Sequence, residues 1–236
     1  MDGLNAPKDR LIIKIIVLGS SNVGKSALIK RYTTGKFSKV RQSTLGSDFM
    51  TKIVDMMGYH VIIQIWVIYM SILFSRFCKI TCYCVKDTAG QERFQSGSIG
   101  APFYRGSNGC LLVYDVTNEA SIEQLVQWRD ELMNRMGNDK YLPIVVVGNK
   151  IDILRGDIGL NQIDVHAWCQ ENKYGYVETS AKDDLGVHAA ITAVVALAIE
   201  QIKVSRGHGQ AESATDGINL SDMYSKPESS CSGCLF

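Results

Sequence analysis

A loop able to bind phosphate groups follows the first apolar run of the sequence. Gly19–Ser26 reads G-x-x-x-x-G-K-S and lies between the apolar run Leu11–Leu18 and a helical pattern that begins at Lys25. Small residues let such a loop curl so that its backbone N–H groups point at phosphates, and the helix N-terminus adds positive potential. Lys25 is expected to reach the β- and γ-phosphates, and the Ser26 hydroxyl is expected to bind Mg²⁺. The residues predicted to line the phosphates are Ser21, Asn22, Val23, Gly24, Lys25, Ser26 and Ala27.

A second motif points to the base of a nucleotide. Asn149–Asp152 reads N-K-I-D and follows directly on the apolar run Ile144–Gly148. The Asp152 carboxylate can accept hydrogen bonds from both N1–H and the 2-amino group of guanine, whereas adenine offers no such donor pair and would leave the carboxylate unpaired. Because this motif lies downstream of a phosphate loop and after a buried strand, it favours GTP and GDP, and an ATP-using enzyme is the weaker alternative.

Residues on either side of Asp152 would complete the base site. Asn149 can hold its loop against the base and the phosphate loop, and the Lys150 side chain can cover one face of the base. A third segment follows the short strand Tyr176–Thr179, where the Ala181 N–H is placed to contact guanine O6. The residues predicted on the base side are Asn149, Lys150, Asp152, Ser180, Ala181 and Lys182.

Groups able to act on the γ-phosphate lie in Asp87–Gln91, which reads D-T-A-G-Q. Asp87 can hold Mg²⁺ through a water molecule, the Gly90 N–H can sense the γ-phosphate at close approach, and Gln91 is placed to orient the attacking water. Thr44 lies between the first helix and the second strand, and its hydroxyl can bind Mg²⁺ only while the γ-phosphate is present. The predicted Mg²⁺ ligands are Ser26, Thr44 and Asp87, and the predicted catalytic residue is Gln91.

Strand-like and helix-like segments alternate along the chain and would position these motifs. Continuous apolar runs such as Leu11–Leu18 are typical of strands covered on both faces, and Ser121–Arg135 has the apolar spacing of a helix. The alternation predicts one α/β domain over residues 11–204, with a mostly parallel six-stranded sheet and helices on both faces. Together with the phosphate-loop motif at Gly19–Ser26, it indicates a P-loop NTPase fold. The other expected strands are Asp48–Asp55, His60–Trp66, Gly109–Val116, Ile144–Gly148 and Tyr176–Thr179, and the other expected helices are Lys25–Thr33, Asp164–Lys173 and Val187–Val204.

Composition narrows the class of protein. The net charge of +1 gives no electrostatic case for nucleic acid, and 46% hydrophobic residues support a sizeable core. Residues 1–10 are polar and residues 205–236 are rich in Gly, Ser, Ala and Asp, so a flexible N-terminus and a flexible tail are expected rather than a second domain. Seven cysteines without a secretory signal indicate free thiols in a reducing, cytosolic compartment. Cys78, Cys82 and Cys84 lack a fourth ligand at a familiar spacing, so a zinc site is not expected.

Taken together, these motifs resemble those of a Ras-superfamily small GTPase, and specifically of a Rab. The resemblance covers roughly residues 10–204 apart from one insertion. The segments that look like Rab signatures are Leu45–Phe49, Trp66, Asp87–Phe94, Phe103–Gly106 and Leu112–Thr117, and those most like the late-endosome and lysosome Rab are Trp128–Leu132 and Ala167–Cys169.

The resemblance to Rab proteins implies a switch that binds GTP or GDP with Mg²⁺, hydrolyses GTP slowly and regulates vesicle traffic. It implies exchange factors, GTPase-activating proteins, a GDP-dissociation inhibitor or escort protein, and effectors that read the switch segments. Phe37 should stack at the edge of the guanine by its position relative to Thr44. Prenyl groups on Cys231, Cys234 or both would attach the chain to the cytoplasmic face of late endosomes, lysosomes or the vacuole, and the protein would cycle with the cytosol. The uncommon spacing of these cysteines leaves the number of lipids open.

Val67–Lys86 interrupts this resemblance. Without it, Gln64–Trp66 would run directly into Asp87–Phe94 and give the continuous Q-I-W-D-T-A-G-Q-E-R-F of Rab proteins. Valine codons begin with GT and one lysine codon ends in AG, so we predict that the segment is a translated intron or a gene-model error. A slipped register, in which Ile80–Val85 replaces His60–Trp66 as the strand before the D-T-A-G-Q motif, is an alternative. A non-catalytic or misfolded product, disabled by the segment, is the alternative to a working switch.

Overall fold

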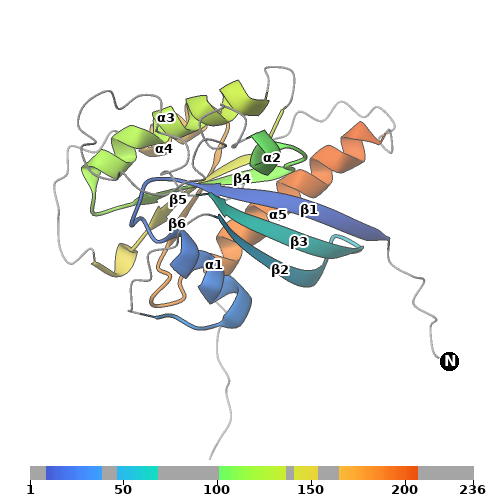
Figure 1. The fold of residues 1–236 in the computed structure, drawn as a ribbon, viewed down its shortest axis with the longest axis horizontal. Coiled ribbons are helices and arrows are strands. Elements are labelled where there is room, and N and C mark those ends of the chain that lie inside the picture. The colour runs from blue at the N-terminus through green and yellow to red at the C-terminus, as the bar shows by residue number, and fades with distance from the viewer. Residues whose placement is uncertain (1–8, 39–46, 69–100, 137–140, 154–164, 207–236) are drawn as a thin grey trace, which may run out of the picture.

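A six-stranded sheet forms the middle layer of the part of the chain that the structure describes (Figure 1). The structure is a computed structural model, and the described residues are 9–38, 47–68, 101–136, 141–153 and 165–206. The strands follow the order β2-β3-β1-β4-β5-β6, in which β2 is antiparallel to β3 and every other neighbouring pair is parallel. This arrangement confirms the expected mostly parallel sheet. The strands are β1 (Arg10–Leu18), β2 (Ser47–Met56), β3 (Tyr59–Ile68), β4 (Gly109–Asp115), β5 (Ile144–Asn149) and β6 (Gly175–Thr179).

Helices cover both faces of this sheet, as predicted. One buried cluster joins the sheet to α1 and α5, and a second cluster joins it to α2, α3 and α4. Figure 1 shows α3 and α4 on one side of the sheet and α1 on the other. The helices are α1 (Lys25–Thr34), α2 (Ala101–Tyr104), α3 (Glu119–Met136), α4 (Val165–Glu171) and α5 (Val187–Ser205), with a 3-10 turn, η4, at Ile151–Ile153.

The apolar patterns explain why these elements form. Every residue of β4 and β5 is buried, because helices cover the middle of the sheet on both faces. In α3 the buried side chains recur at Ile122, Leu125, Trp128 and Leu132, which is the spacing of one helix face. α5 is long and apolar enough to cross a membrane by length and composition, but eight of its 19 residues lie buried in the core of the domain, so here it packs as a core helix.

β3 is longer than the sequence analysis predicted. The expected strand ended at Trp66, but β3 continues through Val67 and Ile68, which are 0% and 2% exposed. Val67 pairs with Val17 of β1, and β2 extends alongside to the same point. β-Branched apolar side chains suit a strand buried on both faces, which explains the extension.

The slipped-register alternative is not what the structure adopts. Residues His60–Trp66 pair in parallel with Arg10–Ile16 of β1, so this segment is the strand that lies beside β1. Its alternation of buried and half-buried side chains fits one fixed register, because a shift by one residue would exchange the two faces. The rest of the predicted insertion, 69–86, lies outside the described residues.

Two of the cysteines lie in the described part of the chain. Cys110 and Cys169 are buried free thiols. Burial raises the pKa of both thiols, to about 12 for Cys169, so both stay protonated and unreactive at neutral pH. Cys78, Cys82, Cys84, Cys231 and Cys234 lie outside the described residues.

Candidate nucleotide-binding site

The phosphate loop connects β1 to α1 and is closely packed by its neighbours. Gly19 has φ +140°, and a Cβ there would lie 2.0 Å from the Val113 carbonyl oxygen of β4. Gly24 has φ +97°, and a Cβ there would lie 2.3 Å from the Asn149 amide nitrogen. Both positions therefore require glycine, for backbone angle and for space. Asn22 also has a positive φ, of 65°, which asparagine adopts more readily than most residues.

Lys25 is buried at the first position of α1. Lys25 is only 4% exposed, and its amine donates hydrogen bonds of 2.7 Å to the carbonyl oxygens of Gly19 and Ser20. Burial lowers the pKa of this amine to about 8. A buried amine at the start of a helix is suited to an anionic ligand, because phosphate charge would offset the cost of burying the amine. Ser26 follows in the same helical turn.

Ser20 anchors the phosphate loop to α3. Its hydroxyl donates a hydrogen bond to the Gln124 side chain and accepts one of 3.4 Å from the Trp128 indole N–H. Ser20 itself is buried. Sequence reasoning missed this attachment, because the partners lie more than a hundred residues further along the chain and carry no local motif.

Asn149 joins three of the segments that sequence reasoning assigned to the site. It ends β5 and is 1% exposed. Its amide N–H donates to the Val23 carbonyl oxygen at 2.8 Å, and its amide oxygen accepts from the Thr179 hydroxyl at 3.1 Å and from the Ala181 N–H at 3.3 Å. The phosphate loop, the N-K-I-D motif and the segment after β6 are thereby held together.

Asp152 lies in η4 with both carboxylate oxygens engaged. One oxygen accepts a hydrogen bond of 2.8 Å from the Ser180 hydroxyl, and the other lies 3.3 Å from the Lys182 amine. Burial raises the pKa of Asp152, but hydrogen bonds from Ser180 and Lys182 outweigh this effect, and the pKa lies below its usual value. The carboxylate is therefore ionised at neutral pH and can accept hydrogen bonds from a base.

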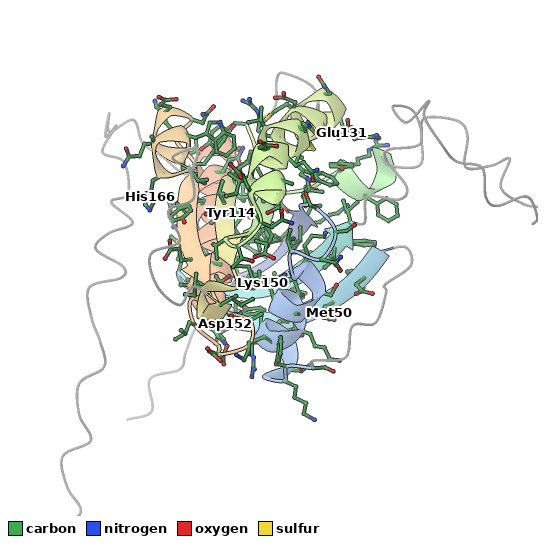
Figure 2. The ribbon with its side chains drawn as sticks, turned by 90° about the vertical axis from the view of Figure 1, so that its left-hand side faces the viewer. Met50, Tyr114, Glu131, Lys150, Asp152 and His166 are labelled. Carbon is green, nitrogen blue, oxygen red and sulfur yellow. The ribbon has the colours of Figure 1, made fainter. Side chains whose placement is uncertain are left out.

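Lys150 lies next to Asp152 in Figure 2 but its amine points back to the sheet. The amine pairs with the Asp115 carboxylate at the end of β4, at 2.5 Å, and Asp115 also accepts hydrogen bonds from the N–H and hydroxyl of Thr117. The Lys150 backbone has φ 73°. Sequence reasoning missed Asp115, although its place at the carboxyl end of a central strand is a signal that could have been used.

Arg31 of α1 supports the segment after β6. Its guanidinium donates to the carbonyl oxygens of Ala181 at 2.9 Å and of Lys182 at 2.7 Å, and it lies 5.8 Å from the ring of Phe37. Phe37 is half-buried beyond the end of α1. This role of Arg31 was also missed, because its partners lie about 150 residues away in the sequence.

The γ-phosphate side of the predicted site is described only in part. Ser26 is described, whereas Thr44, Asp87, Gly90 and Gln91 lie outside the described residues. Within the ranges that the structure covers, no group of three or more His, Cys, Asp or Glu side chains could hold a metal ion. The end of β3, next to the phosphate loop, presents Val67 and Ile68 and no side-chain oxygen.

Three aromatic side chains form a second feature near the end of β3, which we call the aromatic group: Phe49, Trp66 and Phe103. The ring of Trp66 lies 4.6 Å from that of Phe49 and 6.0 Å from that of Phe103, between centroids. Phe49 is 48% exposed. Sequence reasoning quoted all three residues as signature positions but did not foresee that they would touch.

Comparison with known proteins identifies similar chains. The Ras family model matches residues 14–67 and 75–200, so the break in the match falls within the predicted insertion. The GTP-binding protein yptV5 of Volvox carteri is 39% identical, over 83% of this chain and 86% of that protein. The Ypt/Rab-type GTPase ypt7 of Schizosaccharomyces pombe is 37% identical, over 95% of this chain and 98% of that protein. The Ras-related protein Rab7 of Drosophila melanogaster is 37% identical, over 82% of this chain and 83% of that protein.

Proposed function

Because the chain belongs to the Ras family of GTP hydrolases, in its Rab branch, we propose that it is a GTP/GDP switch serving traffic to late endosomes, lysosomes or the vacuole. Support for this destination comes from Trp128–Leu132 and Ala167–Cys169, which are similar to the late-endosome and lysosome Rab. The relatives named ypt7 and Rab7 agree with that subgroup.

Guanine binding rests above all on the arrangement of Asn149 and Asp152. Asn149 holds the N-K-I-D motif against the phosphate loop, and Ser180 and Lys182 orient an ionised Asp152 carboxylate. An ionised acceptor discriminates strongly between a base with two adjacent donors and a base without them, because the wrong base leaves it unpaired. The site is therefore expected to take GTP and GDP and to reject ATP.

The chain's own groups would then act on the phosphates as follows. Backbone N–H groups of residues 21–27 and the Lys25 amine bind the phosphate oxygens. Ser26 and Thr44 would hold Mg²⁺, which neutralises phosphate charge when bound, and Asp87 would join them when it directly follows Trp66 at the end of β3. Gln91 would orient a water molecule for attack on the γ-phosphorus, and the bond to the β–γ bridging oxygen breaks to release phosphate and leave GDP.

Partners would recognise the surface beside the switch segments. The aromatic group is exposed at Phe49 on edge strand β2, and partly exposed aromatic side chains are typical of binding surfaces. Effectors would bind there, exchange factors and GTPase-activating proteins would act at the nucleotide, and a GDP-dissociation inhibitor or escort protein would carry the prenylated form. Cys231 and Cys234 would carry the prenyl groups.

A second candidate is a non-catalytic Rab-like product disabled by the insertion. The observation that favours it is that β3 takes up Val67 and Ile68, the first residues of Val67–Lys86. The D-T-A-G-Q motif is then no longer continuous with the strand beside the phosphate loop.

One experiment separates the two candidates. The full chain is purified without added nucleotide and denatured, and the released nucleotide is identified by ion-exchange chromatography. The proposed switch requires GDP or GTP in near-equal molar amount with protein, and competition by GTP but not ATP. Protein that is folded by circular dichroism and yet carries no guanine nucleotide, and takes up none, would support the disabled product instead.

A further inference from the structure

The carboxyl end of β3 holds an apolar residue at a position where a metal ligand is expected. Val67 pairs with Val17 of β1, two residues before Gly19 and the start of the phosphate loop. It is fully buried, in the same cluster as Val17 and Val23. Ile68, the next residue, faces the opposite cluster with Ile16 and Leu18.

Proteins with this kind of phosphate loop hold Mg²⁺ from two sides. The hydroxyl of the loop's serine or threonine is one side, and an aspartate at the end of a neighbouring strand is the other. In this chain Ser26 supplies the first group. The neighbouring strand is β3, and its residue directly after Trp66 pairs with Val17, two residues before the phosphate loop begins. That residue is Val67 when Val67–Lys86 is present, and it would be Asp87 if the segment were absent.

We propose that Val67 occupies the strand position from which a carboxylate would hold Mg²⁺, so that the 236-residue chain retains guanine nucleotide with little help from Mg²⁺. Val67 and Ile68 at the end of β3 are apolar and offer no ligand to Mg²⁺. The phosphate loop and the base site, in contrast, carry groups that suit a guanine nucleotide. This inference rests on the proposed guanine-nucleotide binding and adds to it a specific dependence on one residue of β3.

The register of β3 is fixed strongly enough to keep Val67 in place. Val67 and Ile68 are buried in opposite clusters, so a shift by one residue would move each into the wrong face. The residue directly opposite Val67 in the neighbouring strand is Asp48 of β2, and this edge strand lies one strand further from the phosphate loop than β3 does. Asp87 is separated from Ile68 by the rest of the insertion, and holding it at the ion would cost the entropy of closing that loop.

The test measures how much Mg²⁺ slows nucleotide release. Protein is loaded with a fluorescent GDP, and its dissociation rate is recorded with millimolar Mg²⁺ and with excess EDTA. We expect EDTA to change the rate less than about twofold in the 236-residue chain, and to raise it about tenfold or more in a version lacking Val67–Lys86. Two matched variants of the 236-residue chain test the position directly. Val67→Asp should make GDP dissociation sensitive to EDTA. Val67→Asn has the same shape without the charge and should leave GDP dissociation insensitive to EDTA.

The reciprocal change keeps the inference testable if a buried aspartate prevents folding of the long chain. In the version lacking Val67–Lys86, Asp87→Val places valine after Trp66 again, and it should abolish the Mg²⁺ effect while GDP stays bound. A Mg²⁺ effect in the 236-residue chain as large as in the shortened version would overturn the inference, as would failure of the long chain alone to hold GDP. If neither version held GDP, the proposed guanine-nucleotide binding itself would be wrong.

Discussion

The Asn149 amide donates a hydrogen bond of 2.8 Å to the Val23 carbonyl oxygen, which fastens the loop after β5 to the phosphate loop. The two residues are 126 positions apart in the sequence. The same side chain accepts from Thr179 and Ala181, so the base side and the phosphate side of the site share one buried amide. In the proposed site, we therefore expect a change at Asn149 to affect base recognition and phosphate binding together.

Asn149→Ala should weaken both folding and nucleotide retention. The substitution leaves the Val23 carbonyl, the Thr179 hydroxyl and the Ala181 N–H without this partner, at a cost of about 2 kcal/mol or more in the free energy of unfolding. Urea unfolding and GDP dissociation measure the two effects. Asn172→Ala is the matched control, because it removes an amide–carbonyl bond of equal length, to Trp168, at the end of α4. Equal GDP dissociation rates in the two variants would contradict the shared role of Asn149.

Asp152→Asn should change the preferred base. Asparagine cannot accept from both guanine donors, so GTP affinity should fall at least about tenfold, whereas xanthosine triphosphate, which carries an oxygen in place of the 2-amino group, should bind better. Isothermal titration with the two nucleotides measures the switch. Asp130→Asn, on the exposed side of α3, is the control and should leave both affinities unchanged. Unchanged GTP affinity in Asp152→Asn would remove Asp152 from the site.

Gln91→Leu should slow hydrolysis without releasing the nucleotide. It removes the group that orients water and leaves the phosphate loop intact, so single-turnover GTP hydrolysis should fall by roughly tenfold to a hundredfold. The contrasting variant is Ser26→Asn, which should favour a GDP-bound or empty form. Equal turnover in wild type and Gln91→Leu would mean that another group positions the water.

Replacing both tail cysteines should release the protein from membranes. Two prenyl chains anchor firmly and one binds reversibly, so the single variants Cys231→Ser and Cys234→Ser report how many chains are attached. Fractionation of cells into membrane and cytosol measures the change, with mass spectrometry of the tail as a direct check. Unchanged membrane partitioning in the double variant would rule out lipid anchoring at these residues.

Removing Val67–Lys86 should improve solubility and GDP affinity. The segment closes a loop at a cost of a few kcal/mol and carries large apolar side chains, against a total domain stability of about 5–15 kcal/mol. Soluble yield and GDP titration of the two versions measure the difference, and transcript sequence across the codons for Trp66 to Asp87 tests the origin of the segment. Peptides from within Val67–Lys86 in soluble, nucleotide-loaded protein from the source cells would show that it belongs to the working protein.

Local patterns were enough to predict most of the fold. The six strands, their mostly parallel arrangement and the helices on both faces follow from apolar runs and helical spacing, as in β4 and α3. The end of β3 was placed too early, because the family motif marked a boundary after Trp66 while Val67 and Ile68 are good strand residues in their own right. The family motif marks the end of the sequence similarity, whereas the burial and strand pairing of Val67 and Ile68 determine where β3 ends.

Only part of the candidate site could be predicted from the sequence. Lys25, Asn149 and Asp152 were predicted as site residues because their neighbours in the sequence form motifs. Ser20, Arg31 and Asp115 were not singled out, because each acts through a partner brought close only by the folded sheet. Such supporting contacts leave no periodicity or spacing in the sequence of a single chain.

The phosphate loop is held from three directions, by β4 against Gly19, by α3 through Ser20 and by Asn149 through Val23. When a ligand binds to a loop that already has its final shape, little free energy is lost in ordering the chain. More of the favourable contact energy then contributes to affinity. We therefore expect a bound nucleotide to be released slowly. A partner that speeds nucleotide release would then have to weaken one of these three contacts. The two hydrogen-bonded contacts involve α3 and the loop after β5, so binding at either element could loosen the phosphate loop.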